Sequence, residues 1–108
     1  MSITINIKYH GQGNDAVNFA KEMSASGIID EIRSKKGNLR YEYYLPYSGE
    51  DYVLLIDEWE NQESLDSHHQ SETMGKIAKL RDKYDLKMEV TRYTKIENEA
   101  KDERYIRK

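Results

Sequence analysis

Strict alternation of apolar and polar residues at the start of the chain is the feature that most constrains the fold. Residues 3–9 switch side chain character at every position, with Ile3, Ile5, Ile7 and Tyr9 on one side and Thr4, Asn6 and Lys8 on the other. A period of two is the signature of a β-strand with one buried face. The 108-residue chain has no Pro- or Ser-rich linker, so it has room for one domain with a modest core.

Similar alternation predicts three further strands. The strand expected over 38–45 is rich in tyrosine and ends at Pro46, and the last strand is expected over about 86–95. Between them, residues 52–59 carry apolar side chains on both sides, which is typical of a central strand, so we expect both of its faces to be buried.

Apolar residues at helical spacing predict the intervening helices. Asn14 or Asp15 can cap the first helix and Ser71 can cap the last one. The expected helical segments are 14–37, broken near Gly27, then 63–70 and 72–84.

The resulting order, βαββαβ, predicts an α+β ferredoxin-like fold in which helices cover one face of a four-stranded antiparallel sheet. The other face still carries Tyr, Leu and Ile side chains, and a second copy of the same sheet would shield it. We therefore expect a homodimer through sheet faces, forming a dimeric α/β barrel. The domain should span residues 1–95, and residues 96–108 form a charged C-terminal extension.

Composition excludes several classes of function. The 17 basic and 20 acidic residues are well mixed and give a net charge of −3, which disfavours nucleic acid as a partner. The absence of cysteine excludes disulfides and thiolate metal sites. No apolar run approaches the roughly 20 residues of a membrane-spanning helix, and the N-terminus does not read as a signal peptide, so we expect a cytoplasmic protein with no membrane partner.

Two segments, residues 37–44 and 55–68, resemble the antibiotic biosynthesis monooxygenase family. The marks are Gly37 before the tyrosine-rich strand, the acidic residues and Trp59 that end the third strand, and His68 nine residues further on. The resemblance covers roughly residues 3–94 on the same order of elements.

This resemblance implies a dimeric barrel with one pocket per subunit. Several members of the family oxidise phenolic or quinol-like aromatics with molecular oxygen and without metal, flavin or other cofactor. It therefore implies a cofactor-independent monooxygenase acting on a quinol or activated phenol. The same fold also hosts other activities, which leaves two alternatives: a non-catalytic barrel that binds a small molecule, and an isomerase of a small hydroxy-ketone.

His68 and Asn6 are the candidate catalytic residues. His68 matches the family histidine, and a neutral imidazole can take a phenolic proton and so create the anion that oxygen attacks. The alternative is that His68 only packs or caps. If the isoleucines of the first strand meet the helices, Asn6 points into the dimer barrel, where its amide could stabilise an oxyanion or peroxide, or simply bond to a neighbouring strand.

Several aromatic and charged residues are candidates for the wall of a pocket. Trp59 could line it, although core filling is the more common role of such a residue. Tyrosines that face the barrel would suit a flat, partly polar ligand, and an arginine near a strand end could orient it. The candidate substrate-binding residues are Trp59, Tyr41, Tyr43, Tyr44, Tyr93 and Arg92.

The histidines do not predict a metal site. His68 and His69 are neighbours on a helix and point about 100° apart, and His10 is the remaining imidazole. A haem-degrading function is disfavoured as well, because relatives of that kind have a tryptophan where this chain has His68, and a haem-ligating histidine near the position of Ala78.

Overall fold

A computed structural model describes residues 2–108 and shows the expected βαββαβ order. The first helical region is split at Gly27 and the second at Ser71. The described residues therefore contain four α-helices and a final 3₁₀ helix. In chain order the elements are β1 (Ile3–His10), α1 (Asp15–Ala25), α2 (Ile28–Arg33), β2 (Asn38–Tyr44), β3 (Tyr52–Trp59), α3 (Gln62–His69), α4 (Glu72–Lys83), β4 (Lys87–Thr94) and η1 (Ala100–Tyr105).

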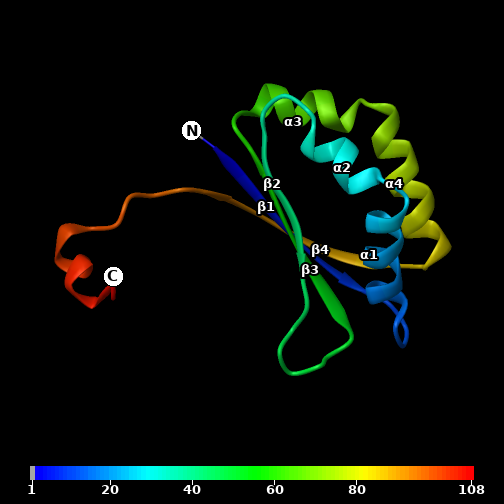
Figure 1. Cartoon of the computed structure of the whole chain (residues 1–108), viewed down its shortest axis with the longest axis horizontal. Helices are drawn as coiled ribbons and strands as arrows, with labels where there is room; N and C mark the ends of the chain where they lie inside the picture. Colours follow the sequence, from blue (N-terminus) through cyan, green and yellow to red (C-terminus); the bar gives the residue numbers. More distant parts are fainter. Residues whose placement is uncertain (1) are drawn as a thin grey trace.

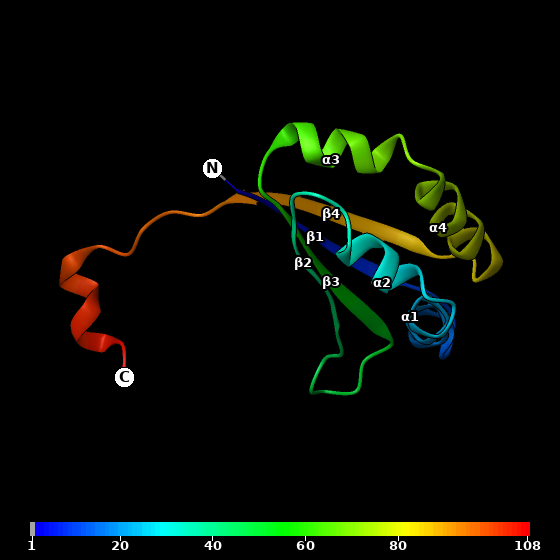
Figure 2. The same ribbon diagram turned by 45° about the horizontal axis from the view of Figure 1, so that its top comes forward.

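The four strands form one open antiparallel sheet in the order β2-β3-β1-β4. Helices α1–α4 all lie on one side of this sheet (Figures 1 and 2). This arrangement confirms the predicted α+β ferredoxin-like fold. Among residues 2–108, no helix is long and apolar enough to cross a membrane.

Alternation in β1 decides which face meets the helices. Its four odd-numbered apolar residues are buried, and they pack with the apolar faces of α1, α2 and α4 in one core. Phe19 and Met23 of α1 and Ile32 of α2 are fully buried in this core. Burying such a stripe is the main source of stability for helices this short.

Strand β3 is buried on one face only, which corrects the expectation that both faces are covered. Val53, Leu55, Asp57 and Trp59 are buried under the helices, whereas Tyr52, Leu54, Ile56 and Glu58 are half-exposed on the other side. The reason is that no segment within residues 2–108 covers the second face of the sheet.

After β4 the chain leaves the sheet in an extended form and ends in η1, well away from the helices (Figure 1). Its side chains are exposed, including those of Ile96 and Tyr105. The assignment of residues 96–108 to a separate extension stays a prediction.

Gly37 joins the end of the helical region to β2 at a point of close approach. Its φ of +87° is left-handed, and a Cβ there would lie 2.2 Å from Ser64 Oγ and 2.5 Å from Ser64 Cβ. The carbonyl of Gly37 accepts a hydrogen bond from the N–H of Glu60 at 2.8 Å. This glycine therefore ties the α2–β2 connection to the start of α3.

We predict that Gly37→Ala is more destabilising than Gly49→Ala. Both glycines have a left-handed φ, which costs an alanine roughly 1–2 kcal/mol, but a Cβ at Gly49 meets open space. Steric conflict with Ser64 should add about 1–3 kcal/mol at Gly37. Urea unfolding measures the difference, and equal losses in the two variants would contradict the close approach.

Candidate functional site

A cavity of about 180 Å³ lies between the sheet and helices α3 and α4. Its wall is largely apolar, with a small number of polar groups that converge on the same space. The apolar lining residues are Ile5, Ile7, Leu55, Met74, Ile77, Met88 and Val90, and the polar ones are Tyr41, Asp57, His68, His69 and Arg81. An apolar pocket with a few convergent polar groups is the usual form of a small-molecule site. We call it the inner cavity.

Asp57 is the carboxyl group of the inner cavity. The register of β3 places it between Leu55 and Trp59 on the buried face, and only 5% of the residue is exposed. Burial raises its pKa to about 7, although the nearby indole N–H of Trp59 and the charge of Arg81 act in the opposite direction. Its Oδ1 has no hydrogen-bond partner among the described residues. Asp57 can therefore exchange a proton near neutral pH.

His68 lies at the end of α3 and is 3% exposed. Its ring stacks on the indole of Trp59, with a centroid distance of 4.9 Å and an interplanar angle of 23°. Burial, followed by the charges of Lys35, His69 and Arg81, lowers its pKa to about 4. The imidazole is thus neutral at pH 7.

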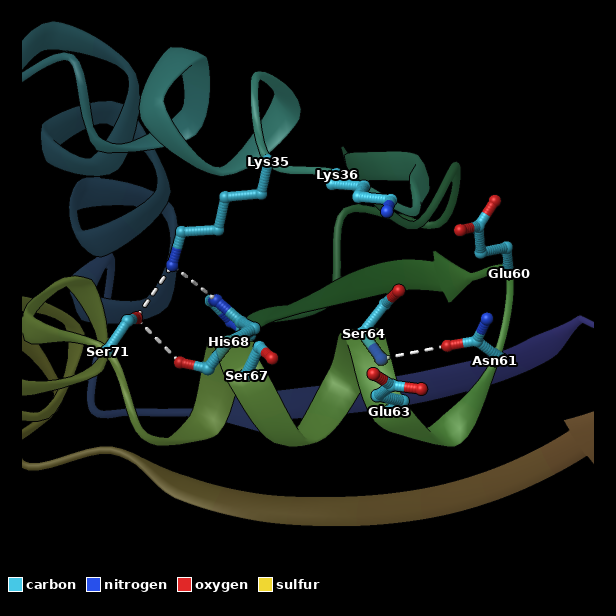
Figure 3. A pocket seen from close by; sticks show the side chains of 9 residues that line it. All are labelled: Lys35, Lys36, Glu60, Asn61, Glu63, Ser64, Ser67, His68 and Ser71. Carbon is cyan, nitrogen blue, oxygen red and sulfur yellow. Dashed lines mark hydrogen bonds between the residues drawn. The ribbon is translucent and has the colours of Figure 1, made fainter.

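A second, outer pocket of about 360 Å³ lies on the other side of α3 (Figure 3). Lys35 and Lys36 approach it from the α2–β2 connection, and the remaining lining residues are Glu60, Asn61, Glu63, Ser64, Ser67, His68 and Ser71. The ammonium group of Lys35 lies 2.9 Å from His68 Nδ1. His68 is therefore part of the wall between the outer pocket and the inner cavity.

Two of the predicted tyrosines lie on the helix side of the sheet. Tyr41 lines the inner cavity, and its hydroxyl is 3.2 Å from that of Tyr43. Burial raises the pKa of both phenols. Tyr43 itself packs edge-on against Phe19, at a centroid distance of 6.1 Å and an angle of 89°, and does not line the inner cavity.

Asn6, Tyr44 and Tyr93 lie on the open face of the sheet, opposite the helices. The register pairs Asn6 with Ile56 and Thr91, and its Oδ1 is buried without a partner in the described chain. The structure therefore does not bring Asn6 and His68 together in one chain. Asn6 does face the side where we expect a second sheet.

Trp59 and Arg92 hold positions around the inner cavity rather than in its wall. Trp59 is fully buried beneath α3 and reaches the cavity only through the ring of His68 that stacks on it. Arg92 pairs with Ile5 on the exposed edge strand β4, and its guanidinium contacts Gln62 of α3. Their roles in binding a substrate stay predictions.

Sequence reasoning missed Asp57 and Arg81. Asp57 lies two residues from Leu55 and two from Trp59, so all three side chains point to the same face of β3. The alternation of this strand therefore already indicated a buried carboxyl. Arg81 follows Ile77 by four residues on α4 and therefore shares its face, where it donates a 2.8 Å hydrogen bond to the hydroxyl of Tyr9.

The inner cavity has the groups needed to remove a proton from a weak organic acid and to hold the resulting anion. Asp57 can accept the proton, while His68 and Tyr41 can donate hydrogen bonds. Within residues 2–108, no three His, Cys, Asp or Glu side chains lie close enough together to hold a metal ion.

Known structures share this fold. SnoaB, a cofactor-independent oxygenase from Streptomyces nogalater, superimposes with a TM-score of 0.75 at 10% identity, over 90% of this chain and 95% of its own. A conserved protein from Methanosarcina mazei Go1 gives 0.75 at 22% identity, over 89% and 94%. Rv0793 from Mycobacterium tuberculosis gives 0.72 at 16% identity, over 91% and 98%.

Sequence comparison identifies the family. No curated protein sequence matches this chain. The family model described as antibiotic biosynthesis monooxygenase matches residues 5–80, which span β1 to most of α4 and include Asp57 and His68. The chain therefore belongs to the antibiotic biosynthesis monooxygenase family.

Proposed function

We propose that this protein is a cofactor-independent monooxygenase that oxidises a quinol or a similar activated phenol in the inner cavity. The observation that carries the proposal is a buried carboxyl, Asp57, whose pKa of about 7 suits proton removal, in an apolar cavity beside the neutral ring of His68. Family membership supports monooxygenase chemistry, and SnoaB is described as a cofactor-independent oxygenase.

The proposed reaction needs no external reductant. Loss of a phenolic proton makes the ring electron-rich, and a ring carbon then adds oxygen to form a peroxide. Cleavage of the O–O bond with loss of water leaves a new carbonyl on the ring. A quinol and one molecule of oxygen thus give a hydroxyquinone and one molecule of water.

Asp57 suits the role of proton acceptor better than His68 does. A base works best when its pKa lies near the operating pH, and the pKa of His68 is about 4 whereas that of Asp57 is about 7. We therefore assign proton removal to Asp57 and stabilisation of the anion to His68. Asn6, which faces the other side of the sheet, has no part in this step.

The size of the inner cavity points to a small substrate. An apolar cavity of roughly 150 Å³ holds one benzene ring, and the inner cavity measures about 180 Å³. We therefore propose a single-ring quinol or phenol. Tyr41 and the methionines Met74 and Met88 line the cavity and would contact its ring.

Oxygen uptake tests this proposal. We expect at least one single-ring quinol in a broad panel to accelerate oxygen consumption, and Asp57→Asn to lower kcat by about 100-fold or more because the base is lost. Asp51→Asn, an exposed residue just before β3, is the matched control and should retain full activity.

The outcome that would sink the proposal is a panel without any turnover, or an Asp57→Asn variant as active as the unmodified protein. Saturable binding of quinols without turnover would instead support the non-catalytic binding barrel. Turnover of a hydroxy-ketone without oxygen would support the isomerase.

The unusual pKa values of Asp57 and His68 should also be visible in stability. The folded chain keeps Asp57 protonated up to about pH 7, while the unfolded chain releases the proton near 3.8, so this group lowers stability as pH rises from 4 to 7. The effect of His68 on stability has the opposite sign, so stability rises with pH. The reason is that the imidazole binds a proton below about pH 6.5 in the unfolded chain but only below about pH 4 in the folded chain. Each effect amounts to at most about 4 kcal/mol.

We therefore expect the contributions of Asp57 and His68 to the pH dependence of stability to oppose each other in the unmodified protein. A variant that lacks one of the two groups should show the contribution of the other. The stability of Asp57→Asn should rise between pH 4 and 6.5, whereas that of His68→Gln should fall between pH 4 and 7. Urea unfolding at a series of pH values gives both slopes. Two variants with the same pH dependence would show that these pKa assignments are wrong.

We also propose that the protein is a homodimer through the open faces of its sheets. Leu54 and Ile56 of β3 leave apolar surface half-exposed there, and the buried Oδ1 of Asn6 lacks a partner in the described chain. A second sheet would cover the apolar surface and could supply that partner.

Introducing a charge on this face should break the dimer. We expect Ile56→Arg to sediment as a monomer at micromolar concentration, because the charge would have to be buried between the sheets. Ala78→Arg, on the exposed side of α4, should remain dimeric. Analytical ultracentrifugation measures both, and a dimeric Ile56→Arg protein would refute the assignment of this interface.

A further inference from the structure

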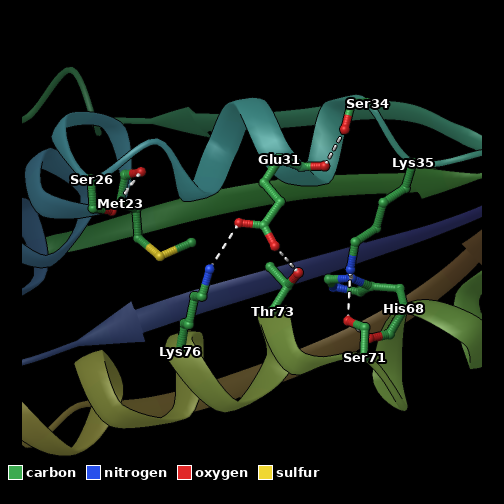
Figure 4. Close-up of polar contacts among 9 residues, drawn as sticks. All are labelled: Met23, Ser26, Glu31, Ser34, Lys35, His68, Ser71, Thr73 and Lys76. Carbon is green, nitrogen blue, oxygen red and sulfur yellow. Dashed lines mark hydrogen bonds and ion pairs between the residues drawn. The ribbon is translucent and has the colours of Figure 1, made fainter.

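We propose that Lys35 is a positioning residue that fixes His68 as the neutral tautomer with its proton on Nε2. Lys35 follows the C-cap of α2, Ser34, and its side chain crosses to the α3–α4 junction (Figure 4). There its Nζ lies 2.9 Å from His68 Nδ1 and 2.7 Å from Ser71 Oγ.

The chemistry of an ammonium group sets the direction of these hydrogen bonds. A lysine ammonium has three N–H donors and no acceptor, so Nδ1 of His68 has to accept with its lone pair. A neutral imidazole carries one proton, and that proton is therefore on Nε2. An imidazolium ion would present N–H groups on both nitrogens and would conflict with Lys35.

Ser71 completes the arrangement. Its hydroxyl donates to the backbone carbonyl of His68 at 2.6 Å, which leaves its oxygen free to accept from Lys35. Ser71 is the N-cap of α4, as predicted, but its side chain makes no capping hydrogen bond because the hydroxyl is used in this way. Lys35 therefore donates in both of its hydrogen bonds, to His68 Nδ1 and to Ser71 Oγ.

Two features of the surroundings act on Lys35. Partial burial lowers the pKa of Lys35, while the charge of the Glu31 carboxylate acts in the opposite direction and favours the ammonium form. Glu31 itself accepts hydrogen bonds from Thr73 at 2.6 Å and from Lys76 at 3.2 Å (Figure 4). Two residues after Lys35, Gly37 fastens the connection to the start of α3. The ammonium group is thus presented to His68 from a fixed segment.

Lys35 does not line the inner cavity, so it acts on that cavity only through His68. With Nδ1 occupied, the ring offers Nε2–H, a donor, to any anion formed there. It offers no lone pair with which to accept a proton. This part of the inference rests on the proposed function, whereas the tautomer itself does not.

NMR of the uniformly ¹⁵N-labelled full chain tests the tautomer. Long-range ¹H–¹⁵N correlations of the imidazoles distinguish a protonated ring nitrogen from an unprotonated one. We expect His68 to carry its proton on Nε2 in the unmodified protein. In Lys35→Met we expect a mixture of tautomers, and Lys35→Arg should restore the single form because arginine also only donates.

Lys36→Met is the matched control. Lys36 is the exposed neighbour of Lys35 in the outer pocket and has no hydrogen bond to His68, so its loss should leave the His68 signals unchanged. A proton on Nδ1 in the unmodified protein would overturn the inference, as would an unchanged His68 spectrum in Lys35→Met. If Lys35→Met does not fold, the unmodified protein and Lys35→Arg still decide the point.

Kinetics with an active quinol test the consequence for turnover. We expect Lys35→Met to lower kcat by about 10-fold with little change in KM, since the contact acts on the anion and not on substrate binding. A tautomer mixture without any change in kcat would overturn the positioning role. If no quinol is turned over at all, the proposed function fails. The NMR experiment would still show which ring nitrogen of His68 carries the proton.

Discussion

The alternation of β1 is the constraint on which the rest of the structure depends. This strand pairs with β3 on one side and with β4 on the other, so its parity decides for the whole sheet which residues meet the helices. Opposite Ile5 lies Asp57, which is thereby buried, while Asn6 and its partner Ile56 turn to the open face. A shift of the register by one residue would exchange the two sets.

Burial then gives the inner cavity its chemistry. The same loss of water raises the pKa of a carboxyl and lowers that of an imidazole, because in each case it disfavours the charged form. Asp57 and His68 are therefore both uncharged between about pH 4 and 7. A cavity in which neither group is charged accepts a neutral aromatic ring at little cost. Near pH 7 Asp57 begins to ionise, and its carboxylate can then take a proton from the bound ring.

The sequence allowed most of the fold to be predicted, because periodicity is a property of neighbouring residues. It also identified His68, Trp59 and Tyr41, which lie together. The alternation along β3 could have indicated that Asp57 is buried beside Leu55 and Trp59. The alternation along β1 could have indicated that Asn6 lies on the opposite face of the sheet from His68. The contact of Lys35 with His68 could not be foreseen, since it joins residues 33 apart and depends on how closely the chain approaches α3 at Gly37.

His68 forms part of the wall between the inner cavity and the outer pocket, and this has a consequence for the electrostatic environment of its ring. The imidazole is almost completely shielded, yet it is held by an ammonium group in a pocket that opens to the solution. Dissolved ions screen charges that they can reach, over a distance of about 8 Å at physiological ionic strength. The electrostatic environment of the buried ring therefore follows the salt content of the medium, even though no ion has to enter the cavity.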